Sequence, residues 1–225
     1  MTDTASFTGI PEAALDFYRR LEQENTKTFW EAHRSEYDAH VKSPVRALCG
    51  ELAEFGPFHL FRPYNDMRFA RNRPPYKVQQ GAYGESEGGA GFYLEVSAAG
   101  LRVGTGYYTM ARDQLERFRA AVDDDTTGAE VDALAAAAAA RTGVTVGALD
   151  ELKTAPRGFP RDHPRITLLR RKGLMIMREF GDPAWLHSRR SVSMVRSFWE
   201  SGAELNAWLD THVGPSTLEP ENFGR

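Results

Sequence analysis

The sequence predicts an α+β fold, in which an antiparallel sheet is covered by helices from both ends of the chain. Apolar residues recur at helical spacing between residues 11 and 55, and again between residues 189 and 212. Between these regions, apolar residues alternate in 92–97 and 101–108 on either side of a short turn, which is typical of a β-hairpin. These patterns place the strands in the middle of the chain and the helices around them.

Three helices are expected before the first strand, over residues 11–22, 28–42 and 45–55. Pro11 stands where its fixed backbone angle favours the first turn of the first helix. The pair Gly56-Pro57 ends the third helix, because neither residue continues a helix well.

The sheet is expected to contain strands at residues 58–69, 92–97, 101–108 and 174–180. A further short strand could form at residues 144–146. Residues 81–91 are rich in glycine and serine, so we expect a loop there. Gly104 and Gly106 in the third strand indicate a bulge or tight packing against a helix or, alternatively, the close approach of another backbone or of a ligand.

Further helices are expected over residues 109–122, 127–143, 189–199 and 203–212, with a loop at 152–164. Thr127 and Glu130 have the spacing of a capping box at the start of the second of these helices. No linker divides the sequence, so we expect one domain over residues 1–225, with residues 1–8 and 214–225 frayed.

The composition is that of a soluble globular protein, with 225 residues, 41% of them hydrophobic and 26% charged. No run of about eighteen apolar residues exists, so no membrane span is expected. Residues 1–6 lack the basic start and apolar run of a signal peptide. A single cysteine, Cys49, excludes an internal disulfide and a multi-cysteine metal site, and it is interpreted as a small buried hydrophobic residue. We therefore expect a cytoplasmic protein without a membrane partner.

Positive charge is concentrated in two segments, although the whole chain has a net charge of −3. Residues 62–77 contain five basic residues and one acid, and residues 157–172 contain six basic residues and one acid. The remainder is therefore acidic, which argues against a generally basic nucleic-acid binder and for a localised anion site. The sequence leaves open whether the two segments share one surface.

The segment 62–77 is the most chemically dense part of the chain. If it continues the strand at 58–69, its alternate residues Arg62, Tyr64, Asp66 and Arg68 share one face. Planar guanidinium groups suit phosphate and carboxylate ligands, because they donate two parallel hydrogen bonds. We therefore expect a small anionic ligand. The candidate ligand-binding residues are Arg62, Tyr64, Asp66, Arg68, Arg71, Arg73, Tyr76 and Lys77.

The same segment carries a spaced pattern, R-x-x-x-D-x-R-F-x-x-N-x-x-x-Y, formed by Arg62, Asp66, Arg68, Phe69, Asn72 and Tyr76. This pattern resembles the signature of the bacterial domain-of-unknown-function 2461 family, whose members are uncharacterised conserved proteins. Asn25, Phe29-Trp30, Tyr37 and Pro44 resemble the helical part of the family pattern, so the resemblance covers almost the whole chain. Asn65 and Arg73 depart from it, since arginine and lysine respectively are usual there. The family implies no agreed activity.

Three other functions remain open. An enzyme could use the same cleft, with Asp66, Tyr76 or His163 in proton transfer. A nucleic-acid-binding module could use both basic segments, and a purely structural reading makes 62–77 an ion-pair network. The histidines lack metal-binding spacing and residues 81–91 lack a phosphate-loop pattern, so no metal and no cofactor are expected. The oligomeric state is left open.

Overall fold

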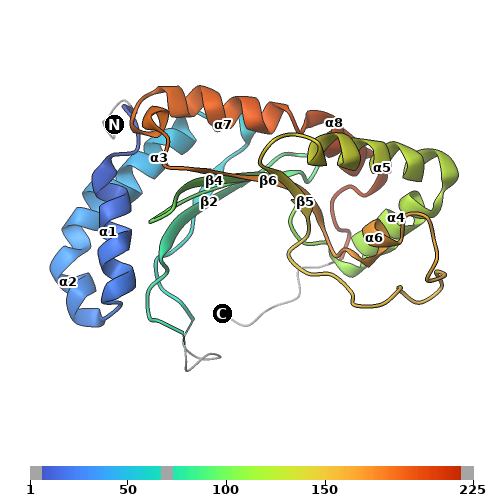
Figure 1. Cartoon of the computed structure of the whole chain (residues 1–225), viewed down its shortest axis with the longest axis horizontal. Helices are drawn as coiled ribbons and strands as arrows, with labels where there is room; N and C mark the ends of the chain where they lie inside the picture. The colour runs from blue at the N-terminus through green and yellow to red at the C-terminus, as the bar shows by residue number, and fades with distance from the viewer. Residues whose placement is uncertain (1–6, 67–72, 219–225) are drawn as a thin grey trace. The chain divides into compact units, whose positions relative to one another are not determined.

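The computed structural model describes residues 7–66 and 73–218. Within this part of the chain the strands form one antiparallel sheet of six strands, in the order β1-β2-β3-β4-β6-β5 (Figure 1). The strands are β1 (Phe58–Leu60), β2 (Gln79–Glu85), β3 (Gly91–Ser97), β4 (Gly100–Tyr107), β5 (Val144–Gly147) and β6 (Leu174–Gly181). With helices from both ends of the chain, this sheet confirms the predicted α+β class.

The helices before the sheet are α1 (Glu12–Gln23), α2 (Lys27–Glu36) and α3 (Ser43–Gly50), with a π-helical segment, Tyr37–Lys42, between α2 and α3 and a 3₁₀ turn at Ala53–Phe55. The later helices are α4 (Arg112–Asp123), α5 (Asp125–Ala139), α6 (Ile166–Arg170), α7 (Arg190–Glu200) and α8 (Ala203–His212), with a 3₁₀ turn at Ala184–His187. The predicted helices at both ends of the chain are therefore present, and their bounds differ by a few residues.

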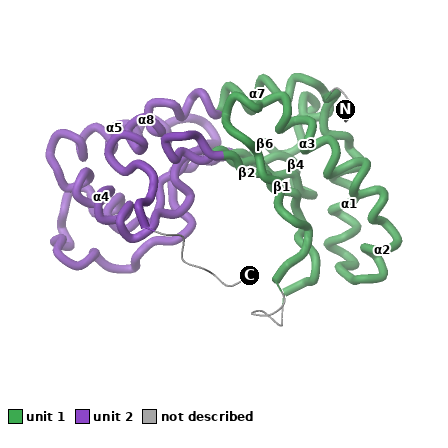
Figure 2. The backbone as a smooth tube through the Cα atoms, turned by 180° about the vertical axis from the view of Figure 1, so that it is seen from behind, with its two compact units in different colours: residues 1–84, 92–103, 179–198 green, residues 85–91, 104–178, 199–225 purple. Residues whose placement is uncertain are grey.

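The chain divides into two compact units (Figure 2). Unit 1 comprises residues 1–84, 92–103 and 179–198, and unit 2 comprises residues 85–91, 104–178 and 199–225. The expectation of a single domain stays a prediction.

Aromatic side chains fill the core of unit 1. Phe17 of α1 is fully buried, and its ring lies 6.1 Å from the rings of Phe29 and Trp30 and 5.8 Å from that of Tyr37. Thr26 starts α2 because its hydroxyl accepts a hydrogen bond from the Phe29 backbone N–H at 3.1 Å. This cap sets the turn that brings the aromatic face of α2 against α1.

In unit 2, α5 begins at a different cap from the one predicted. The carboxylate of Asp124 accepts hydrogen bonds from the N–H groups of Thr126 and Thr127, both at 2.9 Å. The Thr127 hydroxyl instead donates to the carbonyl of Ala121 at 2.6 Å. The capping box at Thr127 was therefore wrong, because an acid three residues earlier already satisfies the first N–H groups of the helix.

The strand predicted over 58–69 is much shorter, and the loop predicted over 81–91 is largely strand. β1 ends at Leu60, and β2 includes residues 81–85. The glycines that indicated a loop lie under aromatic rings. A Cβ on Gly81 would lie 2.9 Å from the Phe61 ring, and one on Gly84 would lie 2.9 Å from the Phe58 ring. Only glycine leaves room for these rings on the sheet.

The two glycines of β4 pack closely against β6, as one of the two sequence interpretations held. A Cβ on Gly106 would lie 2.3 Å from the carbonyl oxygen of Leu174, and its φ of +131° is unfavourable for other residues. At Gly104 the nearest backbone atom would be the carbonyl oxygen of Ile176, at 3.3 Å. These glycines therefore serve packing between strands.

The described residues near the chain ends make specific contacts with the rest of their unit. Phe7 is buried, and its carbonyl accepts a hydrogen bond from Arg189 at 2.9 Å. In unit 2, Asp113 accepts hydrogen bonds from the Ser216 hydroxyl and the Thr217 N–H, both at 2.8 Å. The expectation that residues 1–8 and 214–225 are frayed stays a prediction, and residues 1–6 and 219–225 lie outside the described part.

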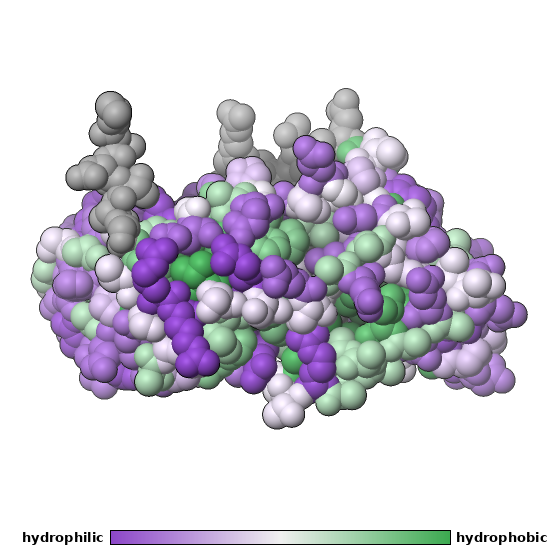
Figure 3. Space-filling model, turned by 90° about the horizontal axis from the view of Figure 1, so that it is seen from above, coloured by the Kyte–Doolittle hydropathy of each residue, from purple (hydrophilic) through white to green (hydrophobic). Residues whose placement is uncertain are grey.

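On the face of the molecule seen in Figure 3, hydrophilic and hydrophobic residues are interspersed. No helix in the described ranges combines the length and the apolar character that crossing a bilayer requires.

Candidate functional site

The predicted basic segment forms a short two-stranded ribbon, which we define as residues 63–65 and 75–77. Tyr64 and Tyr76 form an isolated antiparallel bridge at its centre. Backbone hydrogen bonds lie on either side of it, from Asn65 N–H to Pro75 at 2.9 Å and from Lys77 N–H to Pro63 at 2.7 Å. The pairing brings Arg62 and Lys77, fifteen positions apart in the sequence, together at the base of the ribbon.

The ribbon is anchored to the N-terminal helices. The Asn25 side chain makes two hydrogen bonds to the backbone of Tyr76, donating to its carbonyl at 2.9 Å and accepting from its N–H at 3.0 Å. The Tyr76 ring stacks on Trp30, with ring centroids 4.5 Å apart and an angle of 10° between the planes. Tyr76 is consequently buried, and its contacts position the ribbon.

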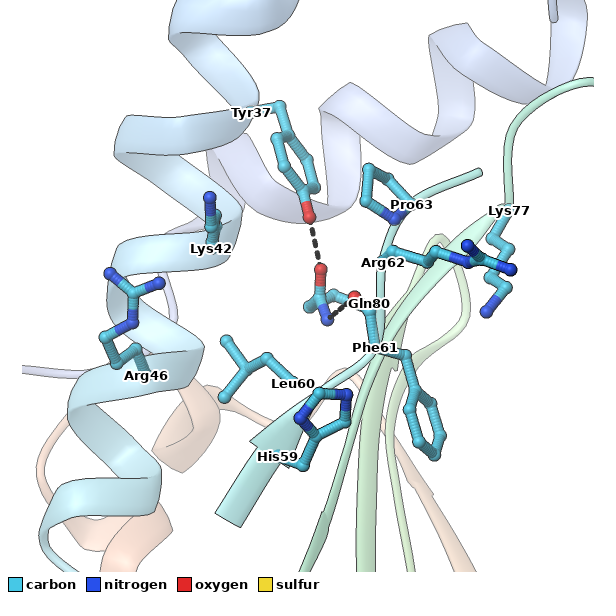
Figure 4. Close-up of a pocket in the computed structure, with 10 residues that line it drawn as sticks. All are labelled: Tyr37, Lys42, Arg46, His59, Leu60, Phe61, Arg62, Pro63, Lys77 and Gln80. Carbon is cyan, nitrogen blue, oxygen red and sulfur yellow. Dashed lines mark hydrogen bonds between the residues drawn. The ribbon is translucent and has the colours of Figure 1, made fainter. Parts of the chain in front are cut away.

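A pocket of about 620 Å³ lies between this ribbon, β1 and the π-helical segment with α3 (Figure 4). Its charged lining consists of Lys42, Arg46, Arg62 and Lys77. Tyr37, His59, Leu60, Phe61, Pro63 and Gln80 complete the described lining. Figure 4 shows Lys42 and Arg46 on the helical wall, with Arg62 and Lys77 beside each other on the opposite side. We call this the cationic pocket.

The π-helical segment provides part of the helical wall, since both Tyr37 and Lys42 belong to it. Single turns of π-helix occur frequently at functional sites, because the widened turn changes the direction in which side chains project. The π-helical segment continues directly into α3 at Ser43, so Lys42 and Arg46 are four positions apart on one continuous helical stretch. Two like charges at this spacing repel each other unless something else compensates.

Carboxylates in the described part of the chain neutralise little of this positive charge. None of the described lining residues is acidic. Lys42 lies 3.5 Å from Asp38, one turn away, and both side chains are somewhat less than half exposed. Among residues 7–66 and 73–218, no carboxylate forms an ion pair with Arg46, Arg62 or Lys77. The pocket therefore has a surplus of cationic donors.

Burial and the surplus of positive charge together lower the pKa of Lys77. Burial lowers the pKa of its ammonium group below the ordinary value, and the positive charge of Arg62 lowers it further. Its Nζ also lies 5.3 Å from the centre of the Phe61 ring, which offers a weak partner for a cation. An anion bound beside Lys77 would raise this lowered pKa and stabilise the charged ammonium group.

The neutral lining of the pocket is fixed by hydrogen bonds. The Tyr37 hydroxyl donates to the side-chain oxygen of Gln80, as the dashed line in Figure 4 shows. The Gln80 amide nitrogen donates to the carbonyls of Phe61 at 2.9 Å and Gly81 at 2.8 Å. Burial, more than any neighbouring charge, raises the pKa of Tyr37 well above its ordinary value, so its hydroxyl stays protonated. These hydrogen bonds fix the neutral lining of the pocket and involve none of its four cations.

Comparison with known protein families identifies a match over residues 13–208, to the family described as conserved hypothetical protein (DUF2461). The chain belongs to this family. The match covers most of the chain and confirms the resemblance to this family that the sequence indicated. No curated protein and no solved structure matches the chain.

The structure separates the predicted site residues of this DUF2461 protein into several groups. Arg62 and Lys77 line the cationic pocket. Tyr64 is exposed, and its ring contacts Trp30 and Tyr76. Arg73 is exposed just before the second strand of the ribbon, Asp66 is half-buried, and neither is among the described lining residues. Arg68 and Arg71 lie outside the described residues.

The alternation that placed Arg62, Tyr64, Asp66 and Arg68 on one strand face was wrong for residues 61–66, because β1 ends at Leu60. Pro63 cannot donate a ladder hydrogen bond, which suits a position outside the strand. Arg62 and Lys77 meet through the ribbon pairing instead.

His163 belongs to unit 2, as does the whole second basic segment, whereas residues 62–77 belong to unit 1. Its Nε2 lies 3.1 Å from the Asp123 carboxylate, and its Nδ1 accepts a hydrogen bond from the Arg165 N–H at 3.0 Å. Both ring nitrogens are therefore engaged in joining α4 to the loop before α6. Catalytic roles for Asp66, Tyr76 and His163, and nucleic-acid binding, stay predictions.

Sequence reasoning missed Lys42, Arg46 and His59. The two helical cations were not among the candidate residues, although their like charges four positions apart, with no acid at i−4 or i+4 of Arg46, were visible in the sequence. That unfavourable pair was the available signal. His59 on β1 gave no comparable signal, because a lone histidine in a strand has many structural uses.

Proposed function

We propose that this protein binds a phosphate- or carboxylate-bearing ligand in the cationic pocket. The observation that carries the proposal is the set of four cations, Lys42, Arg46, Arg62 and Lys77, without an acid among the described lining residues. Two of them are guanidinium groups, which recognise planar or tetrahedral oxyanions through paired hydrogen bonds. Like charges held close together repel each other, so a bound anion would supply the compensation that the described part of the chain does not.

Other arginines in the same unit show how a structural cation is paired, and the pocket arginines differ from them. Arg189 donates to the Glu51 carboxylate and to the Phe7 carbonyl, both at 2.9 Å. Arg196 donates to Glu54 at 2.7 Å and to the carbonyl of Glu51 at 3.0 Å. These two arginines tie α7 to the segment after α3. Arg46 and Arg62 have no such acid among the described residues, which favours a ligand over a structural network.

Isothermal titration calorimetry with inorganic phosphate, pyrophosphate and succinate tests the proposal. We expect binding of at least one of these anions, weakened as ionic strength rises. Arg62→Gln and Lys77→Gln should each weaken it about tenfold, since a hydrogen bond to a charged group contributes on the order of 1.5 kcal/mol. Because an anion raises the lowered pKa of Lys77, binding at alkaline pH should be accompanied by proton uptake.

Matched controls come from α2, where Arg34 and Lys27 are exposed and do not line the pocket. Arg34→Gln and Lys27→Gln should leave affinity unchanged. Thermal unfolding separates the alternatives, because a structural network predicts that Arg62→Gln lowers Tm by several degrees. An unchanged affinity in Arg62→Gln together with a lowered Tm would reject the binding proposal.

A further inference from the structure

A second depression of about 520 Å³ adjoins the cationic pocket and shares three of its lining residues, Arg46, His59 and Leu60. It follows the end of α3 and the turn that leads into β1. The remaining lining consists of Cys49, Gly50, Ala53, Gly56, Pro57 and Phe58. Both depressions lie within unit 1, and the shared residues make them two parts of one groove.

The two parts of the groove differ in chemistry. Beyond the shared Arg46 and His59, the second part has no charged, hydroxyl or amide side chain among its described lining residues. Cys49 adds no reactive group, because burial raises the pKa of its thiol to about 12. A sugar or a nucleobase in this part would find no side-chain partner for its polar atoms, which is unfavourable. A hydrocarbon chain has no hydrogen bonds of its own to lose there, and it would gain from leaving water against Ala53, Pro57 and Phe58.

We propose that the ligand is an amphipathic anion, whose phosphate or carboxylate head occupies the cationic pocket and whose hydrocarbon chain lies along the adjoining part of the groove. This inference rests on the proposed anion binding and adds the class of molecule that carries the anion. Arg46 stands at the junction because it lines both parts. The head group therefore lies next to the start of the chain, as in a monoalkyl phosphate or a fatty carboxylate.

The test uses the full-length protein and two homologous series, methyl to hexyl phosphate and acetate to octanoate, below their micellar concentrations. Affinity should rise about threefold for each added methylene until the groove is filled. The series that binds more tightly at equal chain length identifies the head group. Equal affinity for methyl and hexyl phosphate, or tighter binding of a nucleoside monophosphate than of hexyl phosphate, overturns the assignment of a hydrocarbon chain.

Replacing Gly50 with leucine should fill the second part of the groove without disturbing the fold. A Cβ added there meets no atom within 4 Å, and leucine favours a helix more than glycine does. Gly50→Leu should remove most of the chain-length dependence while leaving the affinity for methyl phosphate within about twofold of wild type. Gly50→Ala provides a milder version of the same test.

The matched control is Gly147→Leu in β5, where an added Cβ also meets no atom within 4 Å and which does not line the groove. It should leave the chain-length dependence intact. Arg62→Gln should weaken every member of both series by a similar factor, because it acts on the head group. If methyl phosphate binds and longer chains add nothing, only the amphipathic ligand is rejected. If no phosphate or carboxylate binds, both proposals are rejected.

Discussion

Replacing Asn25 with alanine should test how the ribbon is held. The Asn25 side chain makes two hydrogen bonds of 2.9 and 3.0 Å with the backbone of Tyr76, which is only 6% exposed. Each contributes about 0.5–1.5 kcal/mol, and leaving a buried backbone group without a partner adds to the loss. Asn25→Ala should therefore lower the free energy of unfolding by about 2–3 kcal/mol. Because the ribbon positions Arg62 and Lys77, anion affinity should fall as well.

Urea unfolding followed by tryptophan fluorescence measures the first effect, and the midpoint should shift without a change in slope. Calorimetry with pyrophosphate measures the second. Asn65→Ala is the control, because Asn65 makes one exposed side-chain hydrogen bond, to the carbonyl of Pro74 at 2.8 Å. It should cost about 0.5 kcal/mol. If Asn25→Ala is no less stable than Asn65→Ala, the ribbon is not anchored through this side chain.

Three further predictions concern other parts of the chain. Hydrogen bonds, first from the Thr217 N–H, hold the pKa of Asp113 well below its usual range. Its contribution to stability is therefore present above the unfolded pKa of about 3.9 and is lost as pH falls below it. Asp113→Asn should flatten the acid limb of a Tm-versus-pH curve, and an unchanged curve would count against this role. Gly106→Ala should destabilise the protein by about 2–4 kcal/mol in urea, and clearly more than Gly104→Ala, because its Cβ would lie 2.3 Å from a backbone oxygen. Cys49, with a pKa raised to about 12 by burial, should resist iodoacetamide at pH 8 until denaturant is added, and rapid native labelling would contradict its burial.

The parts of the fold that periodicity could predict are those in which one face of an element is buried. The hairpin of β3 and β4 was found because Leu94 and Val96 alternate with less buried residues. β2 was missed because its glycines are typical of a loop. They are compatible with a strand only because aromatic rings from another segment cover them. The covering rings, Phe58 and Phe61, precede these glycines by about twenty residues, and nothing local in β2 indicates their position.

The candidate site could be predicted only in part, for a related reason. Local charge density indicated Arg62 and Lys77, which share the pocket. Lys42 and Arg46 come from a helix well before them in the sequence, and only folding brings the two pairs to one cavity. The stacking that makes Tyr76 an anchor of the ribbon likewise depends on Trp30, from another segment. A single sequence contains the residue types but not these pairings.

The discontinuous composition of unit 1 has a consequence for synthesis on the ribosome. Its N-terminal helices and first strands are made early, yet residues 179–198, which include the end of β6 and most of α7, belong to the same compact unit. At about 5–20 residues per second, the early segments wait on the order of ten seconds for these residues to emerge. A nascent chain stopped before residue 179 should therefore expose the apolar faces that α7 covers, and should be a better chaperone substrate than the finished protein.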